Sequence, residues 1–249
     1  MKKIAFLLVM ILLSTNFYAQ KKRGKIIKWL SISAKAGYGN SILVNSDVIA
    51  DEDANIDFAS PAYNFGGRFG VTFGDNVGIF VEPLFSSFNQ EYSINTGNTI
   101  YDKTQEFKSF DMVLELRYTS DFGFYFEAGP VLTKLKSANE TNTGTVTVPA
   151  RTNYFGNFKT QYTSVMFGLG FAAFRGDRFA VNLGLRGTYA LGNFVENSSF
   201  YVLDDGVYHT SASSVETKPF SAKLMIEVNY FFGFWGDANC GRGRLMFFQ

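Results

Sequence analysis

The only histidine of the chain lies next to two hydroxyl side chains, and this grouping is the one best suited to nucleophilic chemistry. His209 is followed by Thr210 and Ser211 in the last long polar stretch of the sequence. Residues two apart in an extended segment share a face, so His209 could take the proton of Ser211 while Glu216 orients the imidazole. Such pairs arise often by chance in serine-rich loops, so we expect a solvated loop histidine and no enzymatic activity.

A group of carboxylates in the first polar stretch is the candidate metal site. Asp47, Asp51, Glu52, Asp53 and Asp57 lie there without a lysine or arginine among them. Hard cations such as calcium take clustered oxygen ligands, but the Asp-x-Asp-x-Asp-Gly spacing of a dedicated calcium loop is missing. The sequence therefore predicts a solvated acidic loop, with neither a metal nor another cofactor.

The composition excludes several classes of protein. A single cysteine, Cys240, rules out an intramolecular disulfide framework and a four-cysteine zinc site. The net charge of +1 and the pI of about 7.7 provide no basic surface for nucleic acid. Charged residues make up 18% of the chain and aromatic residues 17%, which is short of charge for a soluble domain, where about 25% is usual.

Alternation of apolar and polar residues with period two predicts a chain made of strands. After residue 19 no apolar stretch approaches the roughly 20 residues that a membrane-spanning helix requires. The expected strands cover residues 28–44, 62–74, 77–93, 106–119, 122–136, 161–174, 179–194 and 218–232.

The connections between these strands alternate between long and short, which is typical of transmembrane barrels of the outer-membrane type. We therefore predict an all-β fold, an eight-stranded antiparallel up-and-down β-barrel in the bacterial outer membrane. The strands must close into a ring, because lipid offers a free edge no hydrogen-bond partners. Pro83 and Pro130 fall inside strands and each removes a ladder donor, so a bulge or local distortion is expected at both.

Aromatic residues are expected in two girdles at the level of the lipid headgroups, where amphipathic rings are favoured. The inner girdle consists of Trp29, Phe73, Tyr118, Phe122, Phe179, Tyr230 and Phe232. The outer girdle consists of Tyr38, Tyr63, Phe85, Phe110, Tyr162, Tyr189 and Phe220.

The inward faces of the strands carry as many cations as anions, which predicts a filled and charge-paired lumen. Inward glycines on several strands would make room for Phe80, Tyr125 and Met166. The expected lumen charges are Lys35, Arg68, Arg117, Arg186 and Lys223, with Glu82, Asp111, Glu115, Glu127 and Glu227.

The N-terminus has the order of regions found in a secretory signal: two lysines, a short apolar run and a small residue at Ala19. Residues 1–19 are therefore expected to be a signal peptide and 20–27 a basic N-terminal segment. The barrel is expected over residues 28–234, followed by a periplasmic C-terminal tail over 235–249.

The end of the signal, Phe17-Tyr18-Ala19-Gln20, the phrase Phe126-Glu127-Ala128-Gly129-Pro130 and the aromatic last strand through Tyr230-Phe231-Phe232 carry a family resemblance. Together they resemble the PorT-like small outer-membrane β-barrel proteins. The resemblance implies an outer-membrane barrel over about residues 26–234, and some relatives are accessories of protein secretion. It implies no catalytic residues.

The leading functional hypothesis is a non-enzymatic barrel, surrounded by outer-membrane lipid, that acts as a structural or accessory protein of the cell envelope. Its loops or its tail would contact envelope or secretion proteins, and no nucleic acid. Two alternatives remain open. One is a lipid A-modifying enzyme, since His209 and Ser211 resemble the catalytic pair of the deacylase barrels. The other is a narrow conduit for small solutes.

Overall fold

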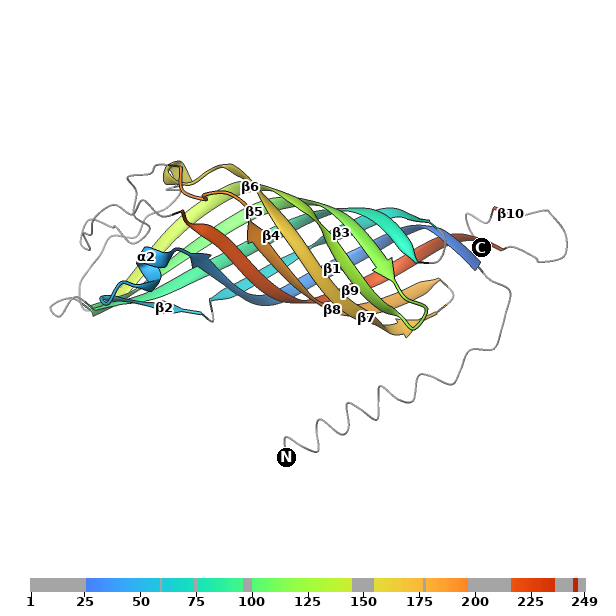
Figure 1. The fold of residues 1–249 in the computed structure, drawn as a ribbon, viewed down its shortest axis with the longest axis horizontal. Helices are drawn as coiled ribbons and strands as arrows, with labels where there is room; N and C mark the ends of the chain where they lie inside the picture. Colours follow the sequence, from blue (N-terminus) through green and yellow to red (C-terminus); the bar gives the residue numbers. More distant parts are fainter. Residues whose placement is uncertain are drawn as a thin grey trace, which may run out of the picture. The chain divides into compact units, whose positions relative to one another are not determined.

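The computed structural model in Figure 1 describes residues 26–58, 60–73, 76–95, 100–144, 155–176, 178–196, 216–235 and 244–245. The chain divides into a large unit, Lys28–Phe232, and a small one formed by Met1–Ile27 and Gly233–Gln249. Within the described part, none of the helices has the length and apolar character that crossing a membrane would take. The predicted signal peptide and most of the predicted tail lie outside the described residues.

The described residues form one sheet of ten strands. Two short helices accompany them, α2 (Ser46–Ile49) and the 3-10 helix η2 (Phe155–Asn157). The strands are β1 (Ile26–Val44), β2 (Ala54–Asp57), β3 (Pro61–Phe73), β4 (Val77–Asn95), β5 (Ile100–Thr119), β6 (Phe124–Gly144), β7 (Gln161–Arg175), β8 (Phe179–Ala190), β9 (Lys218–Trp235) and β10 (Arg244–Leu245).

Eight of these strands form a closed ring of hydrogen bonds. The order is β1-β3-β4-β5-β6-β7-β8-β9, and β1 also pairs with β9. From β1 to β9 each strand of the ring is antiparallel to the next one in this order. The ring removes the free edges that an open sheet would leave. In the small unit, β10 pairs with the end of β9, Arg244 opposite Trp235.

The eight strands of the ring match the eight predicted segments, but β5 and β6 are longer than expected, and β8 is shorter because it ends at Ala190 instead of residue 194. β5 begins at Ile100 instead of residue 106, and β6 continues to Gly144 instead of residue 136. Polar residues such as Lys103 and Glu140 occupy inward positions in these extensions. The alternation of apolar and polar residues is therefore weaker there, and the strand ends were not predicted. The two strands nevertheless remain paired as far as Tyr101 and Gly144.

The two strand prolines interrupt the ladder on one side only. The pairing of β3 with β4 is missing at Glu82 and Pro83, and that of β5 with β6 at Gly129 and Pro130. On their other sides both prolines are paired in continuous ladders. The register resumes unchanged beyond each gap, so the expected distortion is a local loss of hydrogen bonds without a bulge.

The predicted first long connection contains regular structure. Asn45 caps α2, where its side chain accepts a hydrogen bond from the Asp47 amide at 2.9 Å. β2 then pairs with the part of β4 that extends beyond β3, with Ile56 opposite Tyr92. Figure 1 shows α2 and β2 together at the end of the large unit where β1 ends and β3 begins.

Side chains in the ring alternate between a buried inner face and an exposed outer face. In β9, for example, Met225, Glu227 and Asn229 are buried, whereas Ile226 and Val228 are about half exposed. The exposed face is therefore apolar and the buried face largely polar, the reverse of a water-soluble sheet packed on a core.

Glycines on the inner face make room for large side chains. A Cβ atom at Gly170 would overlap the ring of Tyr125 and the carbonyl oxygen of Leu183, whereas at Gly187 the nearest atoms would be 3.9 Å away. We expect Gly170→Ala to lower the free energy of unfolding by about 1–3 kcal/mol because of this overpacking. Gly187→Ala is the matched control and should change it by less than about 1 kcal/mol. Urea titration in lipid vesicles measures both, and equal losses would contradict the packing described.

Candidate functional site

The interior of the ring is built around eight buried charges, each at most 4% exposed. Every strand of the ring except β7 supplies at least one of them. β7 instead places Gly168 against the carboxylate of Glu127, where a Cβ atom would collide. The four cations are Lys35, Arg68, Arg117 and Arg186, and the four anions are Glu82, Glu115, Glu127 and Glu227.

Arg186 joins three of the four carboxylates. Its Nη1 lies 2.5 Å from Glu82 Oε2, and its Nε lies 2.7 Å from Glu127 Oε1. Its Nη2 donates to Glu115 Oε2 at 2.9 Å. Arginine suits this position because its planar guanidinium presents several donors in fixed directions.

Arg117 forms a second junction from β5. Its Nε donates to Glu115 Oε1 at 2.8 Å, and its Nη2 donates to Glu127 Oε2 at 2.7 Å. Two further bonds of 2.9 and 2.8 Å go to Glu227. Because Arg117 and Arg186 share Glu115 and Glu127, the two junctions form a single network.

Lys35 and two aromatic rings complete this network. The Lys35 ammonium lies 2.7 Å from Glu82 and between 3.3 and 3.4 Å from the other three carboxylates. The Arg68 guanidinium carbon lies 3.8 Å from the centre of the Phe80 ring. The Arg117 guanidinium carbon lies 4.2 Å from that of Tyr125. The charges and rings together fill the interior at this level, as expected for a ring of eight strands.

Two of the ten predicted lumen charges do not belong to the network. Asp111 accepts hydrogen bonds from Ser86 at 2.5 Å and Ser109 at 3.1 Å. Lys223 donates to Ser221 at 3.0 Å. The prediction that all ten charges pair with one another is therefore wrong for these two. Asp111 and Lys223 instead border a separate space, which lies closer than the network to the end of the ring where α2 and β2 are found.

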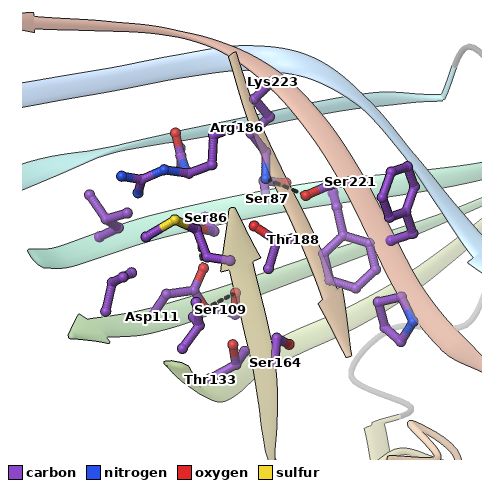
Figure 2. Close-up of a pocket in the computed structure, with 18 of the residues that line it drawn as sticks. Ser86, Ser87, Ser109, Asp111, Thr133, Ser164, Arg186, Thr188, Ser221 and Lys223 are labelled. Carbon is purple, nitrogen blue, oxygen red and sulfur yellow. Dashed lines mark hydrogen bonds between the residues drawn. The ribbon is translucent and has the colours of Figure 1, made fainter. Parts of the chain in front are cut away.

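That space is a pocket of about 50 Å³, shown in Figure 2, and its wall combines serine and threonine residues with apolar side chains. Met166, Leu84, Val113 and Val131 form a small apolar cluster that also lines it. The labelled polar residues of the wall are Ser86, Ser87, Ser109, Asp111, Thr133, Ser164, Arg186, Thr188, Ser221 and Lys223.

An aromatic cluster that the sequence did not predict packs together beyond the pocket. The ring of Phe107 lies 4.9 Å from that of Phe88, 5.0 Å from Phe158 and 5.2 Å from Phe194, measured between centroids. Phe88 also lines the pocket. The sequence pattern places Phe158 in a long connection and Phe194 at the end of the strand predicted over residues 179–194. In the structure β8 ends at Ala190 and both rings lie outside regular strands, so the alternation gave no sign that they meet.

The sequence also did not predict a buried ion pair that lies outside the network. Lys103 and Glu140 approach to 3.4 Å, and both side chains are almost fully buried. They lie in the extensions of β5 and β6, which we expected to be loops. Lys103 and Glu140 lie at alternating inward positions of β5 and β6, and this was the only indication in the sequence. Because no strand was predicted there, neither residue could be assigned to the inner face.

The predicted girdle residues lie on the outer face, with one exception. The exposed or half-buried rings near the short turns are Phe73, Tyr118, Phe122, Phe179, Tyr230 and Phe232, and those toward the other end are Tyr38, Tyr63, Phe85, Phe110, Tyr189 and Phe220. Neighbours in the ladder share a level, as Tyr38 does with Tyr63 and Tyr189 with Phe220. Trp29 lies in β1, but its side chain is outside the described part.

Tyr162 is the exception, and its assignment to the outer girdle is wrong. In β7 the buried residues Ser164 and Met166 share its parity, so Tyr162 faces inward. Its ring contacts that of Phe194, with 5.3 Å between centroids, and it lines the pocket.

The predicted catalytic group is described only in part, since His209 and Ser211 lie outside the described residues. Glu216 is exposed, and its Oε2 forms an ion pair with Lys218 Nζ at 2.6 Å. This hydrogen bond from the lysine ammonium holds the pKa of Glu216 below its usual range. The one described member of the group is thus engaged with a lysine.

The acidic residues of the first connection are spread over α2, the following turn and β2. Asp47 lies in α2, and Asp57 lies in β2. Asp51 accepts a hydrogen bond from the Asp53 amide at 3.0 Å. Among the residues that the structure describes, no group of three or more His, Cys, Asp or Glu is placed to hold a metal ion.

No family model matches the chain, and no curated protein matches it. Among solved structures the chain is similar to the outer membrane protein OprG from Pseudomonas aeruginosa, at 14% identity over 84% of this chain and 98% of that one, with a TM-score of 0.41. It is also similar to Ail of Yersinia pestis, solved with the heparin analogue sucrose octasulfate, at 10% identity over 82% and 99% of the chains, with a TM-score of 0.39. Identities and TM-scores this low do not establish a shared function.

Proposed function

We propose that the chain is an eight-stranded transmembrane β-barrel of the bacterial outer membrane. The observation that carries this proposal is the reversed distribution of side chains, with a band of exposed Leu, Ile and Val between two levels of exposed rings. A membrane-spanning strand needs about 9–11 residues, and the shortest strand of the ring, β8, has 12. The closed ring meets the requirement that every backbone group find a partner inside the bilayer.

The proposed barrel has a closed interior and does not act as an open diffusion channel. The charge network occupies its middle, and the aromatic cluster of Phe88, Phe107, Phe158 and Phe194 occupies the end near the long connections. Both are densely bonded or packed, so opening a path would separate buried ion pairs at a cost of several kcal/mol.

The function we infer is therefore that of a structural or accessory protein of the cell envelope, without enzymatic activity, that binds a protein partner through its long connections. Ile49 and Phe58 support this, because these apolar side chains are 50% and 65% exposed at the α2–β2 end of the ring. Burial of such apolar side chains against a partner is favourable because it removes them from water. The PorT-like resemblance adds secretion-associated proteins as the class of partner to test first.

Site-specific photo-crosslinking in intact cells tests the partner. A photoreactive side chain at position 58 is expected to give one discrete adduct with an envelope protein. The matched control is position 224, where Leu224 is 71% exposed on the lipid-facing wall, and it should give no such adduct. Isolation of only the bare monomer from both positions would count against the accessory role, and conductance steps in planar bilayers would contradict the closed interior.

A further inference from the structure

We propose that the pocket between Asp111 and Lys223 binds a short zwitterion, a molecule with one ammonium and one carboxylate separated by one or two carbons. Asp111 stands on β5 and Lys223 on β9, which are four strands apart in either direction around the ring of eight. The two opposite charges therefore face each other across the interior and border the same space (Figure 2).

Neither charge is neutralised by a direct ion pair in the described part of the chain. The contacts of the Asp111 carboxylate are the hydroxyls of Ser86 and Ser109. The contact of the Lys223 ammonium is the Ser221 hydroxyl, and Lys223 is only 8% exposed. Asp111 is half-buried and Lys223 is buried. Burying a charge is costly when neutral groups alone hold it, so a ligand that brings the complementary charge to each wall is favoured, most of all at Lys223.

An unpartnered polar atom on the same wall strengthens the inference. Within the part of the chain that the structure describes, Asn64 Oδ1 is buried without a hydrogen-bond partner, and Asn64 lines the pocket. The residue is 6% exposed. Its amide oxygen can accept only, which suits a ligand ammonium.

The size of the pocket limits the ligand. A volume of about 50 Å³ holds about four water molecules, or a molecule with about five non-hydrogen atoms. Pro219 and Phe220, at the start of β9, also line the pocket. This inference goes beyond the proposed function because it requires no partner at the connections.

Equilibrium dialysis of radiolabelled glycine against the purified full-length protein in detergent micelles tests the proposal. We expect saturable binding that unlabelled glycine displaces. Acetate and methylammonium, which each carry one of the two charges, should compete at least tenfold more weakly. Asp111→Asn and Lys223→Met should each weaken glycine binding at least tenfold.

Lys108→Met is the matched control, because Lys108 pairs with Glu106 at the exposed surface and its loss should leave binding unchanged. Heat-dependent gel mobility verifies that each variant is folded. If the charge variants do not fold, Ser164→Leu fills the pocket from β7 without removing a charge and should abolish binding. Absence of saturable glycine binding to the wild-type protein would mean that the pocket holds water only, and equal competition by acetate would reduce it to an anion site. Either result overturns the proposal.

Discussion

Replacement of Arg186 by methionine should lower the free energy of unfolding by about 3–5 kcal/mol. The guanidinium bonds Glu82, Glu115 and Glu127, and all three carboxylates are buried. Methionine retains the apolar volume but removes the charge, so three carboxylates remain in the interior with less compensation. Urea titration in lipid vesicles, followed by tryptophan fluorescence and gel mobility, measures the loss.

Two comparisons separate loss of the network from a general effect of removing a cation. Lys108→Met removes an ion pair whose two side chains are 50% and 35% exposed, and it should cost less than about 1 kcal/mol. Adding Glu82→Gln to Arg186→Met should recover part of the loss, since it removes one uncompensated charge. If Arg186→Met and Lys108→Met cost the same, the interior would be hydrated and the proposed closed lumen would be wrong.

The eight strands of the ring could be predicted because each has one apolar and one polar face. A period of two fixes the face of every residue once the strand is known, and this identified Lys35 and Arg186 as inward residues although they are far apart in sequence. The balance of inward charges also indicated that they would meet. What the alternation does not fix is the level of each residue along the interior, which depends on the register between neighbours.

This missing register explains why Asp111 and Lys223 were placed in the network. Both face inward as predicted, but Asp111 pairs with Leu84, two residues along β4 from Glu82, and so lies one level away from the network. Tyr162 was misplaced for a different reason, since the period of two already puts it on the face of Ser164 and Met166, and its assignment to the girdle followed its position near the end of the strand instead of that face. The aromatic cluster depends on Phe158, from a predicted connection, and on Phe194, which lies beyond the end of β8 at Ala190 although the strand was predicted to reach it.

The order of levels inside the ring suggests how the two proposals fit together. The charge network and the aromatic cluster are rigid for different reasons, one through many charge-assisted hydrogen bonds and the other through close ring packing. The pocket lies between them and is lined by Asn64, whose buried side-chain oxygen has no hydrogen-bond partner in the described part of the chain. Binding there would leave the network intact, so a small ligand and a closed interior are compatible.

Leu185→Arg is expected to cost about 2–4 kcal/mol of unfolding free energy, because it places a charge on the lipid-facing side near the middle of the bilayer. Leu185 is 48% exposed, and its ladder partners Leu169 and Leu224 are 56% and 71% exposed. It lies on β8 between the rings of Phe179 and Tyr189, which mark the two interfaces in the proposed barrel.

The matched control lies on the same strand and faces the opposite way. Thr188 lines the pocket, so Thr188→Ser removes one methyl group from the interior and should cost at most about 1 kcal/mol. Both variants can be measured by urea titration after folding into lipid vesicles. Repeating the Leu185→Arg measurement in micelles of a short-chain detergent should reduce its cost, because the arginine then reaches water more easily. Similar costs for the two variants in vesicles would mean that the exposed apolar face is not in contact with lipid, which would contradict the transmembrane barrel itself.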